Sequence, residues 1–141
     1  RLSSLGSPKL LELAHPLTTD SDADLRSAAV QCVGDSRDPR AVELLLRVLR
    51  GEQDSDVRTS TLLVLRNHTA DEIEKELLSN LARKDVSSRE RRATYYQLWK
   101  YPSAATLNCL AQALDEAKEA SVKQAASAAL TFLARLGDCA T

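Results

Sequence analysis

The side chains that could carry out chemistry are few, and they lie far apart in the sequence. The three cysteines (Cys32, Cys109 and Cys139) are odd in number and widely spaced, which fits neither a disulfide framework nor a zinc ribbon. The two histidines, His15 and His68, lie 53 residues apart without a partner pattern around either. We therefore interpret the cysteines as core or tail residues and the histidines as surface or turn residues.

Acidic residues occur in close groups, but their positions indicate structure rather than acid–base catalysis. Asp20, Asp22 and Asp24 precede one helical segment, and Asp54 and Asp56 precede another. Aspartates placed in step with a helical pattern serve as caps, because their side chains accept hydrogen bonds from the first backbone N–H groups of a helix. The sequence also contains no glycine-rich phosphate loop, HExxH or GxSxG motif. We therefore predict no enzyme, no catalytic residue, no metal and no cofactor.

A basic segment followed by an aromatic one has the residue types of an interaction surface. The stretch "RKDVSSRERR", residues 83–92, carries five basic residues against two acidic ones, and "YYQLWKY", residues 95–101, holds four of the five aromatic residues. Tyr, Trp and Arg dominate the hot spots of protein interfaces, so this segment predicts binding. The competing interpretation is structural: Tyr95 or Trp99 fills a gap in the core, and the arginines form a solvated helix start.

The overall composition is typical of one globular domain without a strong charge. The chain has 141 residues, of which 43% are hydrophobic and 4% aromatic, so aliphatic side chains must supply the core. The formal net charge of −1 argues against long-range attraction to nucleic acid. No stretch of about 18 apolar residues could span a membrane. Because the sequence starts at Arg1 and contains no Met, we expect an excised piece of a longer chain.

A repeat with a period near 32 residues organises the chain. Four basic residues mark it, separated by 32, 33 and 32 positions: Arg26, Arg58, Arg91 and Lys123. Within each unit the apolar residues recur at three- and four-residue spacing, which is typical of helices. Each unit has a leucine thirteen positions before its basic residue. We expect these four leucines to occupy equivalent buried positions: Leu13, Leu45, Leu78 and Leu110.

Each unit is predicted to contain two helices. The predicted ranges are 8–17 and 22–34, 38–50 and 54–67, 71–84 and 87–100, and 102–115 and 118–136. Asp38 followed by Pro39 indicates a helix start, because the aspartate caps the helix and the proline needs no hydrogen bond at the first helical position. Asp71 is expected to cap the fifth helix, and Gly137 is expected to end the last one.

Two segments, "ADLRSAAVQCVGDSRDPRAVELLLRVL" and "SDVRTSTLLVL", resemble the HEAT-repeat family, in particular its short bacterial-type variant. The resemblance implies an all-α, right-handed solenoid of about four HEAT-like helix pairs. It would form a single domain over 1–141, with units at 8–34, 38–67, 71–100 and 102–136. The resemblance also implies a structural ladder between neighbouring units, made by a turn aspartate and the arginine that follows it: Asp24, Arg26, Asp56 and Arg58.

The second helices line the concave side of such a stack, and their outward residues are available for binding. We therefore predict a non-enzymatic protein-interaction scaffold that binds a partner segment on this face. The partner would be a protein or peptide that is acidic, phosphorylated or extended. The predicted partner-binding residues are Arg66, Arg89, Arg91, Arg92, Tyr95, Tyr96 and Trp99. Phe132 falls outside the core positions, and if exposed it would mark a docking point for a further unit or a partner.

Two other functions stay open. Residues 89–114 resemble one unit of the helical domain of vitellogenin-type large lipid-transfer proteins, which would make the chain part of a secreted lipid carrier. The sequon at Asn67 would then be available for glycosylation. The second alternative is a HEAT-like nucleic-acid-binding or repair protein, although the balanced charge disfavours it. A scaffold favours a cytoplasmic location, and secretion follows only from the lipid-transfer alternative.

Overall fold

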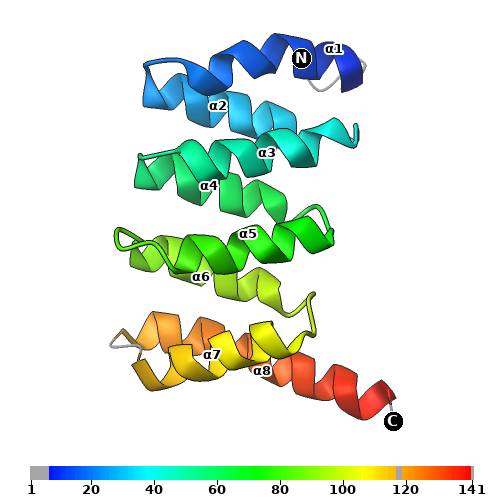
Figure 1. The fold of residues 1–141 in the computed structure, drawn as a ribbon, viewed down its shortest axis with the longest axis vertical. Helices are drawn as coiled ribbons and strands as arrows, with labels where there is room; N and C mark the ends of the chain where they lie inside the picture. Colours follow the sequence, from blue (N-terminus) through cyan, green and yellow to red (C-terminus); the bar gives the residue numbers. More distant parts are fainter. Residues whose placement is uncertain (1–6, 117–118, 141) are drawn as a thin grey trace. The chain divides into compact units, whose positions relative to one another are not determined.

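The computed structural model describes residues 7–116 and 119–140, with side chains described from Lys9 to Arg135 outside that gap, and it contains only helices there (Figure 1). The elements are α1 (Ser7–Ala14), the 3₁₀ helix η2 (His15–Thr19), α2 (Ala23–Gly34), α3 (Arg40–Gly51), α4 (Ser55–Leu65), α5 (Asp71–Leu81), α6 (Ser88–Leu98), α7 (Ala104–Glu116) and α8 (Ala120–Ala140). The fold class is an all-α solenoid of helix pairs, as the sequence predicts.

The chain divides into two compact units, Arg1–Glu76 and Leu77–Thr141. In the N-terminal unit, α2 packs against α1, α3 and α4, and α3 packs against α4. In the C-terminal unit, α8 packs against both α6 and α7 (Figure 1). The core of each unit is aliphatic, as the scarcity of aromatic residues requires. Consecutive helices therefore pair, and second helices such as α2 and α4 also pack on one another.

The second helices start where aspartates and a serine cap them. The Asp22 carboxylate accepts from the Asp24 backbone N–H at 2.9 Å. Asp54 does the same for Asp56 at 2.8 Å and for Val57 at 3.2 Å. These contacts satisfy donors that a helix N-terminus leaves free. The predicted turn role of the paired aspartates is thus confirmed for Asp22 and Asp54.

Several predicted helix ends are wrong, for identifiable reasons. The helix predicted over 8–17 ends at Ala14 and continues as η2, because Pro16 has no N–H and its ring crowds the preceding turn. Asp71 does not precede α5 as a cap but is its first residue. Gly137 does not end α8, which continues to Ala140, and no glycine among the described residues has a positive φ. Gly137 therefore lacks the left-handed conformation that ends many helices.

The predicted column of equivalent leucines is wrong at two of its four positions. Leu45 and Leu110 are fully buried, but Leu13 is 51% exposed and Leu78 is only half-buried. The buried residue lies one position later in the first unit and one earlier in the third, which gives the column Ala14, Leu45, Leu77 and Leu110. These residues lie 12, 13, 14 and 13 positions before the basic residue of the second helix. The connector between paired helices thus varies in length, so an alignment on the basic residue misplaces the first helices.

Candidate partner-binding surface

The basic and aromatic segment of the sequence folds as α6 and the turn that follows it. A capping box fixes the start of this helix. The Ser87 hydroxyl accepts from the Glu90 backbone N–H, and the Glu90 carboxylate accepts from the Ser87 backbone N–H, both at 3.2 Å. Because neighbours on one side of a helix are three or four residues apart, this start determines which aromatic residues face the core.

Tyr95 lies in the core of the C-terminal unit. Its side chain is 3% exposed, and Ala93 and Leu98 of the same helix are buried with it. Burial raises the pKa of the Tyr95 hydroxyl, and the hydrogen bond and charge of Arg91 partly oppose this. Tyr95 is therefore unavailable to a partner, contrary to the prediction. The competing structural interpretation of the aromatic segment holds for this residue.

Arg91 lies on the same side of α6 as Tyr95. Both line a cavity of about 280 Å³ that is also lined by residues of α7 and α8, among them Glu116 and Glu119. At its edge the Ser88 hydroxyl donates to the Glu119 carboxylate at 2.7 Å. Arg91 is half-buried beside acidic residues and has a role in this contact between helices. It does not share the outward face of α6.

Three aromatic side chains form an exposed cluster on the outward face of α6 and α8. Tyr96 is 46% exposed, Trp99 37% and Phe132 50%. Tyr96 and Trp99 are three residues apart and thus neighbours on the helix surface. The Trp99 and Phe132 ring centroids lie 5.5 Å apart with a tilt of 34°, within the range of favourable aromatic pairs. We call Tyr96, Trp99 and Phe132 the aromatic patch. The sequence indicated Phe132 only as a conditional docking point, and the structure confirms its exposure.

The predicted arginines differ in how they relate to the aromatic patch. Arg92 lies one helical turn before Tyr96 and is half-buried, and its Nε makes no hydrogen bond to any described residue. Arg89 is exposed at the start of α6. Arg66 is exposed at the end of α4 and belongs to the N-terminal unit, so it lies outside this surface. Arg135, which the sequence did not single out, is exposed one turn after Phe132.

The ladder between units involves arginine, but its described partner differs from the predicted one. Arg26 of α2 donates to Glu52 through Nε at 2.9 Å and through Nη2 at 3.1 Å. Glu52 lies between α3 and α4 of the second helix pair, so this ion pair joins the first pair to the second. The hydrogen bond that Arg26 donates to Glu52 raises the pKa of Arg26. Asp24 is exposed, and a ladder through Asp56 stays a prediction.

Arg58 is fully buried in the N-terminal unit. Its Nη1 donates to the backbone carbonyls of Glu52 and Gln53, each at 3.1 Å. Arg26 makes the equivalent bonds one repeat earlier, to the carbonyls of Asp20 and Ser21 at 2.8 and 3.2 Å. In the first two units the basic residue that marks the sequence repeat thus closes the turn between paired helices. This role is structural, but these bonds lie within one helix pair, whereas the resemblance implied a ladder between pairs.

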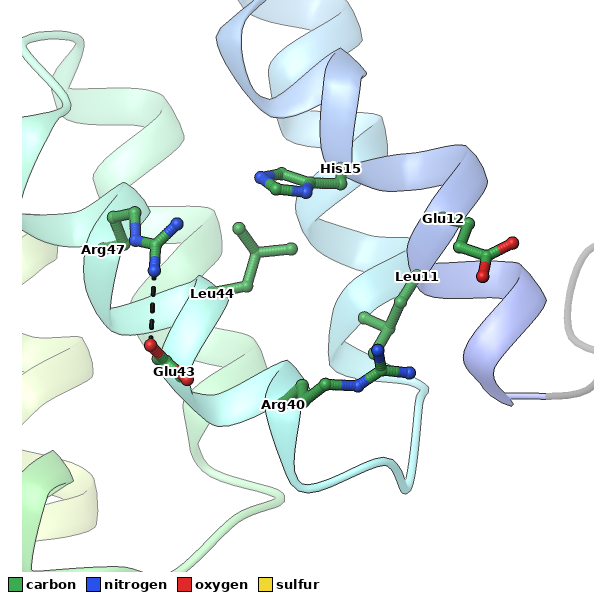
Figure 2. Close-up of a pocket in the computed structure, with 7 residues that line it drawn as sticks. All are labelled: Leu11, Glu12, His15, Arg40, Glu43, Leu44 and Arg47. Atoms are coloured by element: carbon green, nitrogen blue, oxygen red, sulfur yellow. Dashed lines mark hydrogen bonds and ion pairs between the residues drawn. The ribbon is translucent and has the colours of Figure 1, made fainter.

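A second pocket lies in the N-terminal unit, where α1 and η2 face α3 (Figure 2). Its volume is about 260 Å³, and Figure 2 shows the His15 ring directed toward Leu44 and Arg47. Arg47 donates to Glu43 at 3.2 Å. Arg40 donates to Asp38 at 2.8 Å and thereby lowers the pKa of that carboxyl group. Both arginines are thus partly neutralised, and no Ser, Thr or Cys side chain lines the pocket with His15.

The cysteines and His68, which could carry out chemistry, lie in surroundings that indicate structural roles. No group of three potential metal ligands occurs among the described residues. Cys32 and Cys109 are free and half-buried, and burial raises the pKa of the Cys109 thiol, which keeps it protonated. The His68 ring nitrogen Nε2 donates to the Gly34 carbonyl at 3.2 Å, which links α2 to the turn after α4. Cys139 lies outside the described side chains.

None of the helices in the described part of the chain has the length and apolar composition needed to cross a bilayer.

Comparison with known proteins identifies the repeat. The family model described as HEAT repeats matches residues 2–66, which contain the first two helix pairs. A search of curated proteins found no match to the chain. Nothing found supports the resemblance of residues 89–114 to vitellogenin-type proteins. The match covers the repeat whose caps, buried arginine and stacked second helices are described above, and on this basis residues 2–66 are HEAT repeats.

Proposed function

We propose that the chain is a protein-binding scaffold and that the aromatic patch anchors a segment of its partner. HEAT repeats commonly serve as protein-interaction scaffolds. One observation supports the aromatic patch as the binding site: Tyr96, Trp99 and Phe132 lie exposed on two neighbouring second helices. Exposed clusters of large apolar side chains are typical of interaction sites, and Tyr and Trp are among the residues that contribute most to binding.

Charge around the aromatic patch favours an acidic or phosphorylated segment. Arg92 on α6 and Arg135 on α8 each lie one helical turn from a patch residue. Guanidinium groups bind carboxylates and phosphates through paired hydrogen bonds. A partner that places an apolar side chain between Trp99 and Phe132 would bring an adjacent acidic group within reach of these arginines. Its backbone would lie extended along the second helices.

The test compares the patch with an equally exposed residue outside it. Trp99→Ala with Phe132→Ala removes the aromatic pair, and Leu107→Ala on α7 removes a leucine that is 42% exposed. Both variants should keep the helical circular dichroism of the parent, because exposed truncations affect stability little. Proteins captured by the tagged parent from its native cell extract should be retained by Leu107→Ala and lost by the aromatic variant.

Binding of an identified partner is then measured with the purified chain. Trp99 is the only tryptophan, so its fluorescence reports directly on the aromatic patch. Arg92→Glu should weaken a partner with an acidic segment more than about tenfold, as expected when a charged hydrogen bond becomes a repulsion. Unchanged capture by the folded aromatic variant would refute the site. Salt-sensitive DNA binding lost in Arg92→Glu, or copurified lipid with a glycan on Asn67, would support the alternatives instead.

A further inference from the structure

The N-terminal side of the first helix pair presents an apolar surface that no described residue covers. A shallow cavity of about 140 Å³ lies there, lined almost entirely by apolar groups. We call this surface the N-terminal face and define it by Leu13, Leu17, Leu25, Ala28 and Cys32. Three leucines exposed by 41–51% in one place differ from the scattered apolar residues of an ordinary surface.

The same positions of the next helix pair are buried by the first pair. Leu25 is 43% exposed, whereas Val57, which follows it by one repeat of 32 residues, is 1% exposed. Leu13 of the first helix is 51% exposed, whereas its equivalent Leu44 is 8% exposed. Figure 2 shows Leu44 on α3 directed toward α1 and η2. The N-terminal face is therefore equivalent to the surface of the second helix pair that the first pair covers.

The first and second helix pairs are also joined by the ion pair of Arg26 with Glu52, and the N-terminal face has an equivalent of Glu52. Glu52 accepts from Arg26 of the preceding pair and from the Asp54 backbone N–H at 3.0 Å. Asp20 lies 32 residues before Glu52 and accepts from the Asp22 backbone N–H at 2.8 Å in the same way. The Asp20 carboxylate is thus held by the same backbone contact as the Glu52 carboxylate, which binds an arginine.

Close packing between the first and second helix pairs restricts the residue that can face Cys32. Gly34 of the first pair lies against Val64 of the second, and a Cβ added to Gly34 would meet the Val64 Cβ at 2.5 Å. Cys32 is the equivalent of Val64, 32 residues earlier, and carries its Cβ at the same position. A helix that docks on Cys32 as closely as α2 docks on α4 therefore needs a glycine opposite Cys32.

We propose that the N-terminal face binds one further helix pair of the HEAT type, in the register that joins the first pair to the second. The occupant carries an arginine that pairs with Asp20, a glycine opposite Cys32 and apolar side chains against Leu13 and Leu25. This site lies in the N-terminal unit and does not depend on the aromatic patch. A second copy of the chain fits poorly, because α8 has Thr131 at the position of Gly34 and so lacks the glycine that this close approach needs.

A duplicated chain tests the proposal with a defined probe. Residues 7–39 are placed before Lys9 of the parent chain, joined at Pro39, because Pro8 and Pro39 lie at equivalent positions near the start of a first helix. The added pair supplies the arginine and the glycine that the proposal requires. Leu25→Asp is then introduced into the original copy of the duplicated chain and, separately, into the parent. Leu63→Asp, at a leucine that is 42% exposed on α4, is the matched control in both.

Leu25→Asp should lower the melting temperature of the duplicated chain by about 5 °C more than that of the parent, because it places a charge in a newly formed interface. Leu63→Asp should have the same small effect in both chains. Equal effects of Leu25→Asp in the two chains would overturn the proposal. Failure of the duplicated chain to fold would also overturn it, since a pair that docks in the native register introduces no strain.

Analytical ultracentrifugation of the parent chain tests whether a second copy of the chain occupies the N-terminal face instead. We expect a monomer across the accessible concentration range. A dimer that Leu25→Asp dissociates would overturn the proposal in favour of a second copy on the N-terminal face.

Discussion

Gly34 limits how closely the first two helix pairs approach each other. A side chain at this position has no room, because the nearest atoms belong to the stiff side chain of Val64 rather than to a flexible one. Overpacking of this kind typically costs about 1–3 kcal/mol. Gly51, at the end of α3, has nothing within 4 Å of an added Cβ. Comparing alanine substitutions at the two glycines therefore separates the destabilisation caused by crowding from the stabilisation that alanine gives a helix relative to glycine.

We predict that Gly34→Ala lowers the free energy of unfolding by about 1–3 kcal/mol. Gly51→Ala should be neutral or stabilising by up to about 1 kcal/mol, because alanine favours helix and meets no neighbour. Urea denaturation followed by circular dichroism measures both. In a chain that carries Val64→Gly, which removes the clashing Cβ, Gly34→Ala should cost less than it does in the parent. Equal effects of the two glycine substitutions would show that Gly34 is not limited by packing.

Helix α6 shows how a polar residue can occupy an aliphatic position of the repeat. Glu90 occurs where other units have Leu25, Val57 and Val122, yet it is fully buried. Its carboxylate accepts from the Ser87 backbone N–H and from the Asn80 side chain, both at 3.2 Å. A buried carboxylate is tolerated when hydrogen bonds replace its water. The capping box therefore accounts for the divergence of the third unit from the repeat pattern.

Ser87→Ala should destabilise the chain by about 0.5–2 kcal/mol, the usual cost of losing an N-cap. Thr131→Ala is the matched control, because its hydroxyl is exposed and bonds only to the Ser127 carbonyl within α8. That change should stay within about 0.5 kcal/mol. Thermal unfolding monitored at 222 nm measures both variants. A loss in Ser87→Ala no larger than that in Thr131→Ala would contradict the role of the capping box.

The sequence predicts the number and order of the helices because apolar spacing and caps are local signals. It does not predict where the first helices face, since that depends on connector length, as Ala14 and Leu77 show. At the candidate site, the sequence pattern correctly predicted that Tyr96 and Trp99 are exposed. It wrongly predicted the same for Tyr95, which packs against helices distant in sequence. The proximity of Trp99 to Phe132 is a contact between α6 and α8 that no local pattern contains.

At the scale of the whole chain, we expect each part to unfold with its own free energy rather than the chain unfolding as one. In a repeat array each element contacts its neighbours, so damage to one helix pair spreads little. The two compact units each have a core, around Leu45 in one and Leu110 in the other. A single domain over residues 1–141 stays a prediction.

Leu45→Ala should cost about 2–5 kcal/mol, because Leu45 is fully buried and its truncation leaves a cavity. Amide hydrogen exchange should accelerate in α2, α3 and α4, while α6 and α8 keep most of their protection. Leu63→Ala removes an exposed leucine and should leave the exchange pattern nearly unchanged. Uniform acceleration across both units in Leu45→Ala would contradict regional stability and indicate one cooperative transition.

The variable spacing between each buried core residue and its basic residue has a consequence for tolerance to length change. A residue gained or lost in the connector leaves both flanking helices facing as before, because the turn absorbs it. The same change inside a helix would rotate every later side chain by about 100°. Insertions and deletions should therefore accumulate between paired helices, and the helices themselves should keep their lengths.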